Sequence, residues 1–168
     1  MRAMIDLETL GVKPDAKVLN VGIVLFDEKT ILHAYSYSML EHLDEQQDRS
    51  MDANTFRFWL KQSEQAHNFL LYNQGHEEGT LKGKLNHISG VLSRCNEVWG
   101  NGAAFDNVIL RHLLSTVLGR DEWRYKHDRC FRTWLMLNPS AKRIAPELAH
   151  SAVHDALAQT KTLLGYSI

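Results

Sequence analysis

Two carboxylates stand two positions apart near the start of the chain, in the segment Asp6-Leu7-Glu8-Thr9. On a β-strand, alternate residues point to the same face, so Asp6 and Glu8 would lie side by side while Leu7 points the other way. Adjacent carboxylates repel one another unless a cation lies between them. Because hard oxygen ligands suit Mg²⁺ or Mn²⁺, the pattern favours a divalent-metal site. An exposed acidic strand end is the alternative.

A third carboxylate, Asp106, follows a run of small residues in the segment Gly100-Asn101-Gly102-Ala103-Ala104-Phe105-Asp106-Asn107. Glycines let a substrate approach the backbone closely, and Asn107 would then reach that substrate beside Asp106. The alternative is structural, because an aspartate at this position can cap the helix that follows it.

The third segment with chemical potential is His150-Ser151-Ala152-Val153-His154-Asp155. Histidine titrates close to neutral pH and commonly serves as a general base, while Asp155 adds a fourth carboxylate. His150 and His154 are four residues apart, so on a continuous helix they would share a face and could ligate zinc. His154 could equally be the base, and a polar helix face without any chemistry is the third interpretation.

In this order the three segments resemble the DEDDh superfamily of 3′→5′ exonucleases, which includes polymerase proofreading domains, RNase T and oligoribonuclease. The shared pattern is D-x-E, then a glycine-rich approach to F-D, then H-x4-D, and the likeness extends from Asp6 to Ala158. The pattern H-x4-D selects His150 as the general base and leaves His154 among the variable positions.

The resemblance also implies a cofactor, a substrate and a fold. Two divalent cations, Mg²⁺ or Mn²⁺, would be held by four acids: Asp6, Glu8, Asp106 and Asp155. Leu7 and Thr9 would contact the terminal sugar of a nucleic-acid 3′ end, from which 5′-mononucleotides are released. The implied fold is ribonuclease H-like.

A narrower likeness bears on the choice of nucleic acid. Residues 54–63 (NTFRFWLKQS) are similar to the T-x-x-W-W-x-x-Q-S helix of phage exonucleases of the T4 exonuclease A type and prophage exodeoxyribonuclease VIII type, with Phe58 replacing one tryptophan. This likeness favours DNA as the substrate. RNA ends or short oligoribonucleotides are the alternative, because the choice depends on how the pocket treats one 2′-hydroxyl. The remote alternative is a catalytically silent domain that binds a strand end or a partner protein.

The composition limits the partners. The 168 residues include 19 Lys and Arg against 20 Asp and Glu, whereas proteins that grip long nucleic acids usually carry a basic surplus. We therefore expect contacts with only a few nucleotides near an end.

Cys95 and Cys130 lack CxxC spacing, which argues against zinc and a disulfide scaffold and favours the cytoplasm. No apolar run approaches the roughly 18 residues of a membrane span, so we expect no membrane partner. The oligomeric state stays open, and a homodimer is compatible with the sequence.

These residues need a scaffold, and the hydrophobic pattern predicts one. Apolar, β-branched runs predict strands over residues 3–7, 18–26 and 31–40 in an antiparallel meander, with a later strand over 97–99. Helical spacing predicts helices over 54–71, 81–92, 105–118 and 151–164, and residues 41–51 read as a loop. Trp59 fits the buried face of its helix better than a base-stacking role. We expect a single α/β domain over 1–168, with a mixed central β-sheet flanked by α-helices.

Overall fold

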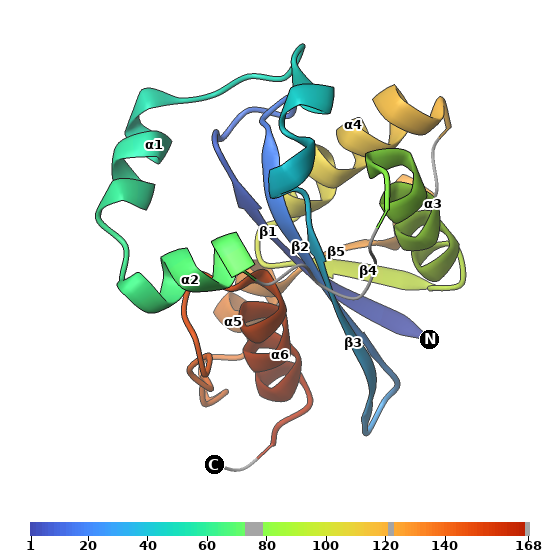
Figure 1. Ribbon diagram of the computed structural model, residues 1–168. Helices are drawn as coiled ribbons and strands as arrows, with labels where there is room; N and C mark the ends of the chain where they lie inside the picture. The colour runs from blue at the N-terminus through green and yellow to red at the C-terminus, as the bar shows by residue number, and fades with distance from the viewer. Residues whose placement is uncertain (73–78, 121–122, 167–168) are drawn as a thin grey trace.

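The computed structural model describes residues 1–72, 79–120 and 123–166 (Figure 1). Its centre is a five-stranded sheet in the order β3-β2-β1-β4-β5. The strands are β1 (Arg2–Thr9), β2 (Val18–Phe26), β3 (Ile31–Ser38), β4 (Glu97–Gly100) and β5 (Asp128–Cys130). The first three strands pair antiparallel, and β4 and β5 continue the sheet in parallel with β1. The predicted α/β class, mixed sheet and opening meander are therefore confirmed.

Helices cover both faces of the sheet, which explains why β2 is buried along its whole length and is apolar except at Asn20. On one face α3 (Leu81–Leu92) and α4 (Asp106–Leu118) pack on the side chains of Ala3, Ile5 and Leu7. On the other face α5 (Phe131–Leu137) and α6 (Ala152–Leu163) cover Met4 and its neighbours on β2 (Figure 1). Since side chains alternate along a strand, Asp6 and Glu8 share the face of Met4 and point toward α6.

The helix predicted over residues 54–71 is two helices, α1 (Ala53–Leu60) and α2 (Glu64–Tyr72). The backbone N–H of Lys61 turns back to the carbonyl of Phe58 and ends α1, and the Ser63 hydroxyl accepts the Ala66 N–H at the start of α2. Asp52 caps α1 by accepting the N–H groups of residues 54 and 55.

Short elements fill much of the remaining chain. Neither β5 nor α5 was predicted, and residues expected to form a loop contain two 3₁₀ turns, η1 (Leu40–His42) and η2 (Asp44–Gln46). A third, η3 (Tyr125–His127), leads into β5. In the described part of the chain, no helix combines the length and apolarity that crossing a bilayer requires.

Candidate active site

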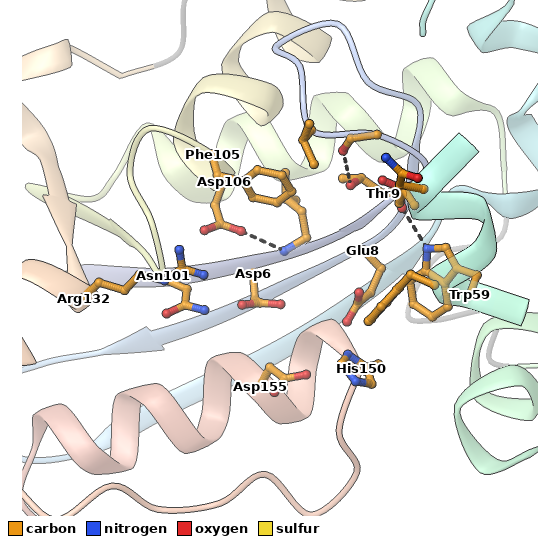
Figure 2. Close-up of a pocket in the computed structure, with 16 residues that line it drawn as sticks. Asp6, Glu8, Thr9, Trp59, Asn101, Phe105, Asp106, Arg132, His150 and Asp155 are labelled. Carbon is orange, nitrogen blue, oxygen red and sulfur yellow. Dashed lines mark hydrogen bonds between the residues drawn. The ribbon is translucent and has the colours of Figure 1, made fainter. Parts of the chain in front are cut away.

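An open cleft of about 550 Å³ lies where the end of β1 meets the starts of α4 and α6. All five residues predicted for catalysis and metal binding line it: Asp6, Glu8, Asp106, His150 and Asp155. Figure 2 shows the carboxylates of Asp6, Glu8 and Asp155 facing one another across the gap between β1 and α6. Segments separated by almost the whole length of the sequence thus meet at one place.

Three of the carboxylates form a compact group. One oxygen from each of Asp6, Glu8 and Asp155 lies within 4.8 Å of the others. Asp6 and Glu8 are buried, and Asp155 is half-buried in the first turn of α6. The Asp6 carboxylate accepts a hydrogen bond of 2.8 Å from the side-chain amide of Gln159, one turn further along α6.

Asp106 is held by the backbone on its two sides. Its Oδ1 accepts the N–H of Leu7 at 3.3 Å, and its Oδ2 accepts the N–H of Gly102 at 2.9 Å. Asp106 is the first residue of α4, and its side chain is turned toward β1 and residue 102. The capping interpretation is therefore wrong, because both donors lie outside the helix.

In the glycine-rich segment, Gly100 lies in close contact with the first residues of α4. A Cβ on Gly100 would lie 2.3 Å from the Asn107 Oδ1 and 3.0 Å from the Asp106 Cβ. Gly100 therefore allows the start of α4 to pack against β4, a different role from the close substrate approach expected from the sequence.

Asn107 does not reach the cleft, contrary to our expectation. Its side chain is fully buried, and its amide nitrogen donates to the carbonyl of Val98 at 2.9 Å and to Asp128 at 3.0 Å. Successive residues of a helix are turned by about 100°, so Asn107 points into the protein when Asp106 points into the cleft. Its role is to attach α4 to the sheet.

The two histidines have different surroundings. His150 precedes α6 in a left-handed backbone conformation (φ 61°), and its ring meets Phe58 edge-on with 5.0 Å between ring centroids. The His154 ring accepts or donates a 2.7 Å hydrogen bond with the Ser151 hydroxyl and contacts Phe69. Because α6 begins at Ala152, His150 and His154 do not share a helix face, and the zinc-pair interpretation loses its basis.

The electrostatics of the cleft favour a bound cation. Burial, reinforced by Asp106 and Glu8, raises the pKa of Asp6 well above its usual value. Burial, followed by the charges of Asp155 and Asp106, raises the pKa of Glu8 to about 8. The pKa of Asp106 rises to about 6 through burial, although its backbone hydrogen bonds act in the opposite direction. Among the described residues no Lys or Arg forms an ion pair with these acids, so this oxygen-donor set fits a divalent cation.

Comparison with known protein families matches residues 1–166 to the 3′-5′ exoribonuclease Rv2179c-like domain. The chain belongs to this family. It is thus a 3′→5′ exonuclease, a hydrolase, as the three motifs predicted. The narrower likeness to phage exonucleases finds no support in the comparison. No curated protein matches the chain.

The structure also brings residues to the cleft that were not among the predicted site residues. Phe58, Asn101, Phe105 and Arg132 also line the cleft. Trp59 is buried as expected, with its indole N–H donating to the Thr9 carbonyl at 2.8 Å, and it borders the cleft with one edge. Gln159 had a detectable signal, because it lies four residues after Asp155 and so on the same helix face.

Proposed function

We propose that this exonuclease shortens RNA from its 3′ end and releases 5′-mononucleotides. The observation that carries the proposal is the meeting of four carboxylates and His150 in one open cleft, in a chain whose family is described by exoribonuclease activity. The expectation of DNA depended on the phage likeness, which the comparison does not support, so RNA is the better-supported substrate.

Divalent cations are the cofactors this site would use. Asp6, Glu8, Asp106 and Asp155 would hold two of them, in the DEDDh arrangement. Such ions generate a nucleophilic water at neutral pH and stabilise the leaving oxygen in phosphodiester hydrolysis. The raised carboxyl pKa values support this assignment, because a cation returns buried carboxyl groups to their ionised form.

His150 would accept the proton of the attacking water. Its ring borders the cleft and lies outside the regular helix, on the same side as Phe58. The 3′ oxygen of the penultimate nucleotide would leave. A general base in this position contributes on the order of 10²–10⁴ in rate.

The terminal nucleoside would lie against the end of β1. Leu7 and Thr9 line the cleft on either side of Glu8, where a β-bulge interrupts the pairing of β1 with β2. Bulges commonly re-aim side chains beside active sites. Phe58 is 41% exposed and offers an aromatic surface for the terminal base.

The test is a cleavage assay on RNA and DNA oligonucleotides of the same sequence, labelled at the 5′ end. We expect stepwise shortening with Mg²⁺ or Mn²⁺, faster for RNA, and no activity in excess chelator. A blocked 3′ end should protect the strand, and a blocked 5′ end should not. An Asp6→Asn variant purified in parallel controls for contaminating nucleases.

Each part of the proposal can fail separately. Faster cleavage of DNA would reassign the substrate, and turnover in chelator would remove the metal ions from the mechanism. Cutting of a closed circle would identify an endonuclease.

A further inference from the structure

A second hollow adjoins the catalytic cleft. It has a volume of about 290 Å³ and is formed by α5 and the residues that follow it. Arg132 lines both the cleft and this hollow, so the two are neighbours that share one side chain. Arg143 lies on its wall, and no acidic side chain lines it within the described chain.

The two arginines are available for a ligand. Both are exposed, and neither forms an ion pair with any described residue. Two other arginines are engaged: Arg111 on α4 binds Asp128 at 2.9 Å, and Arg129 on β5 lies 3.4 Å from Glu97. Of these four arginines, only Arg132 and Arg143 form no salt bridge with a described residue, although the charge of Arg132 opposes the burial that raises the pKa of Asp106 in the cleft.

The cleft has two different sides. Figure 2 shows Arg132 and Asn101 on one side of the carboxylates, and Trp59 and His150 on the other. The second side is aromatic, and the hydrogen bond from Trp59 to the carbonyl of Thr9 fixes it in place. The first side leads into the second hollow.

An exonuclease substrate is equally asymmetric. One nucleotide lies beyond the scissile bond, and the rest of the strand extends in the opposite direction. The aromatic side suits the single terminal nucleoside. The strand must then leave past Arg132, because this side continues into a further hollow.

We propose that the hollow between α5 and residues 138–143 binds the nucleotides immediately upstream of the scissile bond. Arg132 and Arg143 bind their phosphates, since a guanidinium matches the geometry of phosphate oxygens. Met136, which is 72% exposed, and Pro139 provide apolar surface for a base. The inference depends on the proposed function, because it takes the carboxylate cluster as the position of the scissile phosphate. Two phosphate contacts also agree with a net charge of −1.

The salt dependence of binding tests this strand path. The probes are 5′-fluorescein oligoadenylates of two and five ribonucleotides, with Ca²⁺ present and the intactness of the RNA checked on a gel. Anisotropy gives the affinity at several salt concentrations for the wild type, Arg132→Gln and Arg143→Gln. Arg94→Gln, which removes an exposed charge on the turn after α3, is the matched control.

For the pentanucleotide, each substitution in the hollow should lower the slope of log affinity against log salt by about 0.7. Arg143→Gln should weaken pentanucleotide binding about fivefold and dinucleotide binding much less, because a dinucleotide has no phosphate that extends to Arg143. Arg94→Gln should change neither quantity.

Two results would overturn the inference while leaving the function intact. In the first, the wild type shortens RNA, but Arg132→Gln and Arg143→Gln keep the wild-type slope of log affinity against log salt. In the second, Arg94→Gln lowers this slope and the affinity as much as the two substitutions in the hollow do. A wild type that neither binds nor shortens the pentanucleotide would instead overturn the proposed function itself. Melting temperatures of all variants show whether a loss of binding reflects a loss of folding.

Discussion

At the scale of single residues, the carboxylates are oriented by hydrogen bonds that leave them able to bind a cation. Asp106 accepts one backbone N–H on each oxygen, and Asp6 accepts one amide from Gln159. A carboxylate has about four lone-pair sites, so each oxygen keeps capacity for a metal ion. Such supporting hydrogen bonds determine how well the side chains that would bind a metal ion are preorganised.

Gln159 provides the first residue-scale prediction. Gln159→Ala removes the donor that orients Asp6, so we expect the Mn²⁺ concentration for half-maximal activity to rise about 10-fold or more. Isothermal titration of Mn²⁺ into the nuclease should show the same loss without substrate. Gln65→Ala, on the exposed side of α2, is the control. An unchanged Mn²⁺ affinity in Gln159→Ala would show that Asp6 is oriented without this bond.

The second residue-scale prediction separates the histidines. His150→Ala should lose on the order of 10² or more in turnover and largely retain substrate binding. His154→Ala should lose far less, because its ring is engaged with Ser151 and Phe69 away from the cleft. Extra Mn²⁺ should partly rescue Asp155→Ala but not His150→Ala. Equal inactivation by the two histidine substitutions, measured as single-turnover rates, would contradict the assignment of the base.

D-x-E on a strand already defines a shared face for Asp6 and Glu8, but only the resemblance to the DEDDh pattern selected all five residues that meet in the cleft. The sequence could not show which arginine is available to bind phosphate, since the pairing of Arg111 depends on where Asp128 lies in the fold, and the position of Arg132 at the cleft depends on the fold as well. The error at Asn107 has a similar cause. Adjacency to Asp106 in sequence says little about direction once the segment becomes a helix.

At the scale of elements, a glycine determines how closely α6 approaches the sheet. Gly22 lies opposite Asp6 in the pairing of β1 with β2, and a Cβ built there would lie 2.3 Å from the backbone of Ala152. The start of α6 therefore rests directly on β2. This contact sets the position of both His150 and Asp155 relative to Asp6.

Gly22→Ala should consequently damage both stability and activity. The added methyl group meets backbone atoms that cannot move aside, so we expect a loss of about 1–3 kcal/mol in unfolding free energy together with a lower kcat. Gly90→Ala in α3 is the matched control, because nothing lies within 4 Å of its Cβ position and alanine favours the helix by about 0.5–1 kcal/mol. Urea unfolding and RNA cleavage measure the two effects. Full activity in a stably folded Gly22→Ala variant would mean that the close contact between α6 and β2 is not needed for activity.

Hydrophobic periodicity predicted the long elements well and the short ones poorly. The nine-residue β2 and twelve-residue α3 have the predicted bounds, because buried strands and helices of this length carry a clear pattern. The three residues of β5 and seven of α5 are too few to show a period. The break between α1 and α2 was missed for another reason, since apolar residues continue at helical spacing across it.

At the scale of the whole molecule, buried carboxylates make the stability of the fold depend on pH. Glu8 and Asp106 have pKa values of about 8 and about 6 without metal, both above the ordinary values near 4. A group whose pKa is raised by folding stabilises the fold when protonated, and that contribution disappears as the pH rises through the folded pKa. The proposed metal ions would replace the protons, because metal binding needs ionised ligands.

We therefore expect the metal-free protein to lose stability between about pH 4 and pH 8, the window between the ordinary carboxyl pKa values and the raised pKa values of Asp106 and Glu8. The melting temperature in chelator should fall across this range, and the increase produced by saturating Mn²⁺ should grow as the pH rises. Calorimetry at pH 5.5, 7 and 8.5 with Mn²⁺ or chelator measures both trends. Glu8→Gln keeps the shape of the side chain but does not titrate. In chelator, the melting temperature of this variant should fall less between pH 7 and pH 8.5 than that of the wild type does. A chelator curve that is flat or rising, or a Mn²⁺ increment independent of pH, would show that the carboxyl groups are not held together in the folded protein.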